Sequence, residues 1–323
     1  MSSNATPQQP LYDFKGKNVF ISGGSRGIGL DIALKLAKLG ANVAIAAKTA
    51  DPHPKLQGTI YTAAKAIDAA GGRGLPIICD IRFEDQVHAA VEKTVKEFGG
   101  IDILINNASA ISLTPMTETP MKRFDLMNQI NGRGTYLCTL ACLPYLRQSA
   151  QKSRNPHVLT LSPPIDVRPF WFENHTAYSM AKFAMSLCTL GLSGEFRQYG
   201  IAVNALWPLT AIDTSAMNVI LDESQKTNKY RAPSIMSDAA AVILSQDSRA
   251  YTGNFVIDEA ILRQLGVTNF DVYKLDPKCP DLDLVPDFFI PEDIYAQARN
   301  GEIVKRDFVV KGILGLQKKA AKL

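Results

Sequence analysis

The sequence predicts an α/β protein in which a doubly wound, mostly parallel sheet of seven strands has helices on both faces. Short apolar or β-branched runs alternate with longer amphipathic stretches from Lys17 to about Leu265, which is typical of repeated strand–helix units. The strand runs are continuously apolar, as in parallel strands that are buried on both faces. We therefore expect a single domain over residues 14–265, preceded by a flexible segment over 1–13 and followed by an extension over 266–323.

Each strand is indicated by a short apolar run bounded by turn residues. The seven expected strands are 18–22, 42–46, 75–79, 101–106, 157–161, 201–206 and 254–257. The stretches between them have helical spacing, and three expected helices, 28–39, 84–98 and 177–199, end before a glycine that suits a helix C-cap. Beyond residue 265 the pattern gives way to a Pro- and Asp-rich stretch and a basic tail, which we expect to wrap the core.

The composition is that of an ordinary globular protein, with 46% hydrophobic and 20% charged residues in a chain of 323. A net charge of +4 is slight for this length and argues against a nucleic-acid-binding protein. The five cysteines form no C-x-x-C pair and the four histidines lack ligand spacing, so we expect reduced thiols and no metal site. No apolar run reaches the roughly 18 residues that a membrane helix needs, so we expect no membrane span.

The first strand runs directly into a glycine-rich turn, SGGSRGIG over residues 22–29, and the turn runs into the first helix. This order is typical of a Rossmann fold, in which the pyrophosphate of a dinucleotide lies at the helix N-terminus. Glycine lets the backbone turn tightly and approach the phosphates without a Cβ, although an ordinary glycine-rich loop is the alternative. The turn residues that we expect to bind the cofactor are Gly23, Ser25, Arg26, Gly27, Ile28 and Gly29.

The cofactor is predicted to be NADP(H). An NAD-binding Rossmann fold usually has an Asp or Glu about 20 residues beyond the turn, at the end of the second strand, where this chain has Lys48. Lys48 and Arg26 would together form a cationic pocket suited to the 2′-phosphate of NADP. The alternative is that both are solvated surface charges.

The G-x-x-x-G-x-G spacing of the turn resembles that of the short-chain dehydrogenase/reductase family. The resemblance extends to Asp80 after the third strand, which stands where the family has an Asp that caps the adenine. It also extends to Asn107 in the NNA sequence over 106–108, which resembles the family's N-N-A-G element beneath the cofactor. Ser109 takes the place of the final glycine of that element.

Tyr178 and Lys182 are the strongest catalytic candidates, because their i,i+4 spacing places an ammonium one helical turn from a phenol. We expect the cation to lower the pKa of Tyr178, which would then exchange a proton with the substrate oxygen while a nicotinamide exchanges hydride with the carbon. Tyr61 and Lys65 have the same spacing but lie between the second and third strands. Tyr178 follows the fifth strand, whose C-terminal edge shares a cleft with the glycine turn, and this position favours Tyr178 and Lys182.

The family resemblance implies two further catalytic positions. Asn131 resembles the family's helix Asn that holds a water in the proton relay, although an Asn that bonds locally within its helix is the alternative. The family's Ser at the end of the fifth strand orients the substrate carbonyl, but here Pro163 occupies its place and Ser162 stands one residue earlier. Either the local turn brings the Ser162 hydroxyl into the cleft, or the substrate oxygen is bound with less help.

Aromatic residues lie near the expected cleft, in the segment PFWF over 169–172 and at Trp207 after the sixth strand. These rings indicate an apolar substrate, a fatty-acyl or steroid-like carbonyl or alcohol. The alternative is that they simply pack the extension against the core. The expected function is an NADP(H)-dependent oxidoreductase acting on such a pair. The alternative, which Pro163 favours, is a non-catalytic NADPH-binding protein of lipid metabolism in which cofactor occupancy controls a partner or lipid.

Several stretches resemble a narrower group within the family, among them NNASAISLT, AVNALWPLTAI and TGNFVIDEAIL. Members of that group often carry a sterol-carrier-like C-terminal domain, and we expect none here. The family resemblance also implies a homodimer or homotetramer formed through the long helices. The ending Ala321, Lys322 and Leu323 resembles the S-K-L signal, so we expect a peroxisomal protein that binds the peroxisomal import receptor, with a cytoplasmic location as the alternative.

Overall fold

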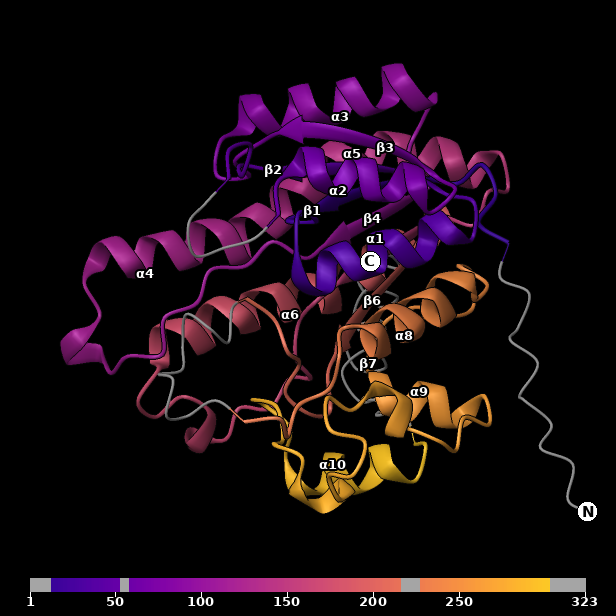
Figure 1. Cartoon of the computed structure of the whole chain (residues 1–323). Helices are drawn as coiled ribbons and strands as arrows, with labels where there is room; N and C mark the ends of the chain where they lie inside the picture. Colours follow the sequence, from indigo (N-terminus) through magenta and orange to yellow (C-terminus); the bar gives the residue numbers. More distant parts are fainter. Residues whose placement is uncertain (1–12, 53–57, 216–226, 303–323) are drawn as a thin grey trace, which may run out of the picture.

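The computed structural model describes residues 13–52, 58–215 and 227–302, and a seven-stranded sheet lies at its centre (Figure 1). The strands are β1 (Asn18–Ser22), β2 (Asn42–Ala47), β3 (Arg73–Ile78), β4 (Ile103–Asn106), β5 (His157–Thr160), β6 (Ala202–Trp207) and β7 (Phe255–Ile257). Their order is β3-β2-β1-β4-β5-β6-β7, and every neighbouring pair is parallel. The strand order reverses between β1 and β4, which is where open sheets of this kind bind ligands at the carboxyl ends of the strands. The predicted fold class is confirmed.

All seven predicted strands form, and most of their ends differ from the prediction by one or two residues. β1 has the predicted ends. β3 begins two residues earlier than predicted, because it is an edge strand whose first residue, Arg73, is exposed and gives no apolar signal. β4 begins at Ile103, two residues later than predicted.

Helices cover both faces of the sheet (Figure 1). The described α-helices are α1 (Gly27–Lys38), α2 (Ile60–Ala69), α3 (Glu84–Phe98), α4 (Met121–Asn128), α5 (Gly134–Gln151), α6 (Thr176–Phe196), α8 (Ser234–Ser245), α9 (Asp258–Gln264) and α10 (Glu292–Arg299). Val19 and Ile21 of β1 belong to a core cluster shared with α1, α2 and α8, whereas Phe20 belongs to a cluster shared with α3, α5 and α6. This alternation follows from the two-residue period of a strand.

Glycines in the left-handed conformation follow two of the helices, and α3 ends at the predicted residue. α3 is followed by Gly99 with a φ of 85°. α6 ends at Phe196, and residues 197–199 form a short 3-10 turn before Gly200, whose φ is 70°. Because glycine adopts this left-handed conformation at little cost, it is a dependable sequence signal for a helix end.

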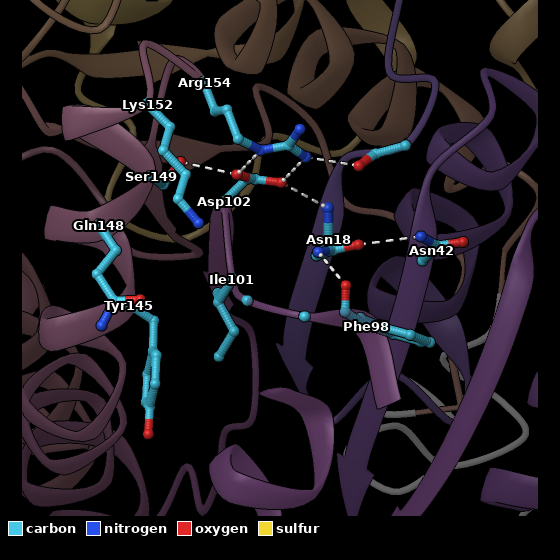
Figure 2. Close-up of a pocket in the computed structure, with 13 residues that line it drawn as sticks. Asn18, Asn42, Phe98, Ile101, Asp102, Tyr145, Gln148, Ser149, Lys152 and Arg154 are labelled. Carbon is cyan, nitrogen blue, oxygen red and sulfur yellow. Dashed lines mark hydrogen bonds and ion pairs between the residues drawn. The ribbon is translucent and has the colours of Figure 1, made fainter. Parts of the chain in front are cut away.

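Asp102 joins several elements at the amino end of the sheet (Figure 2). Its carboxylate accepts hydrogen bonds from the backbone N–H of Asn18 at 2.9 Å, from the Ser149 hydroxyl at 2.7 Å and from the Arg154 guanidinium at 2.6 and 2.7 Å. These contacts tie β1 and α5 to the chain entering β4. The side chains line a polar cavity of about 280 Å³ at the sheet edge opposite to the glycine turn.

The C-terminal extension, over residues 266–302, packs along the carboxyl ends of β6 and β7. The backbone N–H of Asp287 donates to the carbonyl oxygen of Leu209 at 3.1 Å. The indole Nε1 of Trp207 donates to the carbonyl oxygen of Phe288 at 2.7 Å. The extension continues into α10, which packs against α9 (Figure 1).

A buried ion cluster also holds the extension in place. Glu259, at the start of α9, is fully buried and pairs with Arg231, with Arg263 at 2.6 Å and with Arg299 of α10 at 3.4 Å. Arg299 pairs in turn with Asp281 at 3.0 Å. The extension is therefore anchored to the sheet by charge as well as by packing, while the predicted boundary after residue 265 stays a prediction.

Two predictions about the chain ends fall largely or wholly outside the described residues. They concern the N-terminal segment over 1–13, of which only Asp13 is described, and the ending Ala321, Lys322 and Leu323. Within the described part of the chain, none of the helices is long and apolar enough to cross a membrane.

Candidate active site

The glycine turn between β1 and α1 is packed tightly against the end of β4. A Cβ on Gly23 would lie 2.8 Å from the Cα of Ala108, and one on Gly29 would lie 2.4 Å from the Nδ2 of Asn107. Asn107 Nδ2 donates to the carbonyl oxygens of Ser22 at 3.1 Å and Gly23 at 2.9 Å. Asn107 thus fixes the shape of the turn, and only glycine fits at these two positions.

The N-terminus of α1 presents its first backbone amides without a competing side chain. Arg26 is the N-cap residue and makes no capping hydrogen bond, and the first turn has no acidic residue. Gly27 has a φ of 55°, Ser25 is buried and Ile28 is partly buried. An uncapped helix N-terminus that follows a glycine turn is suited to a phosphate group. The residues present therefore fit the pyrophosphate of a dinucleotide.

The cationic residues predicted to surround the cofactor lie near this turn. Lys48, at the end of β2, is exposed, and Arg26 donates from Nη2 to the carbonyl oxygen of Gly58 at 2.8 Å. The carboxylate of Asp80 is bound by the guanidinium of Arg82 at distances between 2.6 and 3.0 Å. Arg82, and to a smaller extent Lys48, lowers the pKa of Asp80. Arg82 belongs to no motif, and sequence reasoning missed it.

Lys182 lies in the buried interior beside the ends of β5 and β6. Its Nζ donates to the carbonyl oxygen of Leu161 at 2.7 Å and lies 4.8 Å from the ring centre of Trp207. Burial lowers the pKa of Lys182 to about 7, although the carboxylate of Asp287 acts in the opposite direction. An amine in this environment exchanges protons near neutral pH.

Tyr178 is also buried, one turn earlier on α6, and its ring stacks on Phe289 with 6.1 Å between ring centres. Burial, and then the charge of Asp287, raises the pKa of Tyr178. The prediction that Lys182 lowers the pKa of Tyr178 is therefore wrong for this structure. The reason is that a buried tyrosinate loses its hydration while the Lys182 amine is directed to Leu161. By contrast, Tyr61 is exposed on α2, as its position in the sequence indicated.

Asn131 lies in a π-helical turn, over Gln129–Arg133, between α4 and α5. Its side chain is fully buried, accepts a hydrogen bond from the N–H of Ala110 at 2.8 Å and donates to the carbonyl oxygen of Ala110 at 3.1 Å. Asn131 therefore holds the loop that follows β4 and does not bond locally within its own helix. Its role in a proton relay stays a prediction.

Ser162 and Pro163 follow β5 directly. The Ser162 hydroxyl is buried and has no hydrogen-bond partner among the described residues. Pro163 occupies the place of the family's Ser, and its carbonyl oxygen accepts a hydrogen bond from Ser186 at 2.7 Å. The two alternatives for Ser162 both stay open, and Pro163 contributes no donor.

The aromatic residues near Tyr178 gather around Phe289 of the extension. Its ring centre lies 5.1 Å from that of Phe183, 5.9 Å from that of Trp171 and 6.1 Å from that of Trp207. Trp171 and Trp207 thus pack the extension against the core, which is the second of the two sequence interpretations. They do so directly beside Tyr178, so the cluster also borders the candidate catalytic pair.

Asp287 is a second ionisable residue of this site that sequence reasoning missed. It is partly buried, it lies two residues before Phe289, and its charge acts on both Tyr178 and Lys182. Its only sequence signal is an acidic residue between a proline and two aromatic residues in the PDFF stretch. Such a signal does not say which part of the fold the residue contacts.

The fold and the site define a class of protein, and comparison with known proteins agrees. The family described as short chain dehydrogenase matches residues 17–225, and this chain belongs to that family. It is 57% identical over 282 residues to hydroxysteroid dehydrogenase-like protein 2 of Danio rerio, covering 86% of this chain and 66% of that protein. It is 56% identical to the Homo sapiens protein of the same name, covering 86% of this chain and 64% of that protein.

The chain therefore spans just under two thirds of the length of these curated relatives. The narrower resemblance found in the sequence is confirmed, because hydroxysteroid dehydrogenase-like protein 2 is that group. Among solved structures, a putative dehydrogenase from Xanthomonas campestris is 52% identical with a TM-score of 0.82, covering 87% of this chain and 100% of that chain. A short chain dehydrogenase from Mycobacterium thermoresistibile is 50% identical with a TM-score of 0.80, covering 86% and 96%.

Proposed function

We propose that this protein is an NADP(H)-dependent oxidoreductase that interconverts an apolar carbonyl compound, fatty-acyl or steroid-like, and its alcohol. The observation that carries the proposal is the burial of Tyr178 and Lys182 one turn apart on α6, beside the carboxyl ends of β5 and β6. The glycine turn lies at the carboxyl end of β1, at the same edge of the sheet. Membership of the short chain dehydrogenase family supports the reaction class.

In this proposal Tyr178 transfers a proton to or from the substrate oxygen. Because burial and Asp287 raise its pKa, Tyr178 is held protonated, which is the form that donates a proton when a carbonyl is reduced. Lys182 is the second ionisable group beside it, fixed by the carbonyl oxygen of Leu161. A bound nicotinamide would supply or accept the hydride.

The cofactor would be held by the glycine turn and the N-terminus of α1. Asn107 would keep the turn in shape through its hydrogen bonds to the carbonyl oxygens of Ser22 and Gly23. Lys48 and Arg26 favour NADP(H) because their charges suit a 2′-phosphate. The aromatic side chains around Phe289 favour an apolar substrate, since they exclude water from the neighbourhood of Tyr178.

The test uses purified protein, NADPH and a panel of acyl, retinoid and steroid carbonyls. We expect the wild type to oxidise NADPH with at least one of them, and Tyr178→Phe to bind NADPH equally well but turn over about 100-fold more slowly or worse. Tyr61→Phe is the matched control, because Tyr61 has the same spacing to a lysine on an exposed helix face. Equal activity of the Tyr178→Phe variant and the wild type would refute the role of Tyr178.

Pro163 favours a second candidate function, a non-catalytic NADPH-binding protein of lipid metabolism in which cofactor occupancy controls a partner or a lipid. A non-catalytic protein does not need the hydroxyl donor that Pro163 replaces, since it has no substrate oxygen to orient. Tight NADPH binding without turnover across the whole carbonyl panel would favour it over the oxidoreductase.

We also propose a homodimer or homotetramer and a peroxisomal location, through recognition of the ending Ala321, Lys322 and Leu323 by the import receptor. The location is checked by comparing an N-terminally fluorescent fusion with the same fusion lacking these three residues. Retention of the peroxisomal signal after their removal would contradict the assignment.

A further inference from the structure

The segment of the extension around Asp287 is held in a defined place over the end of β6. On one side its backbone pairs with the chain after β6, through Asp287 and Leu209 at 3.1 Å. On the other side the Phe288 carbonyl oxygen accepts a hydrogen bond from Trp207. Phe289 then adopts a φ of 64°, which is uncommon and strained for a bulky residue. A strained residue persists only where the surrounding contacts fix it.

Phe289 supplies those contacts, because it is fully buried and its ring stacks on Tyr178 and packs edge-on against Phe183. Asp287 lies two residues before Phe289 and is partly buried, and its charge acts on both Tyr178 and Lys182. It comes from the extension and not from the sheet and helices that carry the rest of the site. Among the described residues, Asp287 is the acidic residue whose charge acts on both of these side chains.

We propose that Asp287 is a positioning residue of the active site, whose carboxyl group determines how protons are shared by Tyr178 and Lys182. The proposal rests on the proposed function for its catalytic consequence, but the effect on the two side chains does not depend on turnover.

The charge of Asp287 acts in opposite directions on deprotonated Tyr178 and protonated Lys182. A carboxylate at Asp287 opposes the formation of tyrosinate at Tyr178 and favours the ammonium form of Lys182. Burial raises the pKa of Asp287 itself to about 7, and burial lowers that of Lys182 to about 7. The two groups therefore change protonation in the same range, and the state of one affects the state of the other.

Other ionisable groups face this segment as well. Asp258, at the start of α9, raises the pKa of Asp287, whereas Lys182 lowers it. His175, just before α6, contacts the ring of Phe288 with 5.3 Å between ring centres. Asp258 and His175 are the same in the wild type and in the variants below, so a difference between these proteins reports the change at Asp287.

The first experiment follows the protonation of Lys182 by carbon NMR of protein labelled at lysine, with Lys182→Met used to assign the signal. We expect Lys182 to titrate near pH 7 in the wild type and at least about one pH unit lower in Asp287→Asn. Asp287→Glu keeps an ionisable carboxyl group and should restore most of the shift. Asp283→Asn is the matched control, since Asp283 is an exposed acid of the same extension and should leave the titration unchanged.

The second experiment is the pH profile of kcat/KM with whichever carbonyl or alcohol of the panel is turned over. Asp287→Asn should move the alkaline limb, which reports Tyr178, to lower pH, again with rescue by Asp287→Glu. A folded Asp287→Asn protein with an unchanged Lys182 titration refutes the proposal. If neither the wild type nor any variant turns over a substrate, but the Lys182 titration is shifted in Asp287→Asn, the proposed function is overturned and the role of Asp287 is supported.

Discussion

Single side chains at this site make contacts that the neighbouring residues in the sequence do not predict. Asn107 donates to two carbonyl oxygens of the glycine turn, and Asn131 binds both backbone groups of Ala110. Asn107 is partly buried and Asn131 is fully buried, and in both the amide bonds to backbone and so fixes a loop. Lys48 differs from them, because it is exposed and its charge acts through space.

Lys48 allows a sharp test of cofactor choice. Lys48→Asp should lower the ratio of NADPH to NADH affinity by on the order of tenfold, because a carboxylate repels the 2′-phosphate that a lysine attracts. It should also raise the pKa of Asp80, which the Lys48 charge now helps to lower. Titration of each cofactor by fluorescence measures the ratio.

The control for this prediction is Lys65→Asp, which makes the same charge change on the exposed face of α2. An affinity ratio that is the same in wild type, Lys48→Asp and Lys65→Asp would show that Lys48 does not contact the 2′-phosphate.

The two ends of the sheet have different roles in this fold. At the amino end, Asp102 links β1, β4 and α5 through charged hydrogen bonds (Figure 2). At the carboxyl end, the strands deliver the glycine turn, Leu161 and Trp207 to the candidate active site. The amino end therefore serves stability, and neither residue of the candidate catalytic pair lines its polar cavity.

Asp102→Asn should lower the free energy of unfolding by about 2 kcal/mol, because it leaves Arg154 and two other donors with a weaker acceptor. The figure is below that for a fully buried pair, since the Arg154 side chain is 38% exposed. Its hydrogen-bond partners lower the pKa of Asp102 below 3.8. The stabilisation is therefore present above pH 3.8 and is lost as the pH falls through the lower pKa of the folded state.

Denaturant unfolding at neutral and acid pH measures both effects. Glu97→Gln is the control, because Glu97 forms an exposed pair with Arg73 and should change the unfolding free energy by less than about 1 kcal/mol. A loss of the same small size for Asp102→Asn would contradict the stabilising role of Asp102.

At the scale of the whole molecule, the extension completes the carboxyl edge of the sheet. It is fixed by the aromatic cluster around Phe289 and by the ion cluster around Glu259. The two tryptophans of the chain, Trp171 and Trp207, both contact Phe289. Intrinsic fluorescence therefore reports on the docking of the extension.

Phe289→Ala should lower the free energy of unfolding by about 3–4 kcal/mol, the usual cost of removing a buried aromatic ring, and should change the tryptophan emission of the folded protein. Phe288→Ala is the matched control, because Phe288 is the adjacent residue and its side chain is 41% exposed. Equal effects of the two variants on stability and emission would show that the cluster does not hold the extension.

Much of the site is predictable because its signals are local. The glycine turn follows from steric requirements. The choice of Tyr178 over Tyr61 as the candidate catalytic residue follows from the strand that precedes each of them. The edge strand β3 was placed less accurately because exposed residues give no apolar signal. The direction of the pKa shift of Tyr178 was wrong because helical spacing shows that a lysine is near but not where its amine is bound.

The sequence by itself therefore determined the doubly wound sheet, the glycine turn and the choice of Tyr178 and Lys182 as the candidate catalytic pair, since periodicity and backbone sterics act over short stretches of chain. Only the tertiary structure decided that Asn131 binds Ala110, that Phe289 packs on Tyr178 and that Asp287 acts on Lys182. The physical reason is that burial and charge act through space, between residues far apart in the sequence.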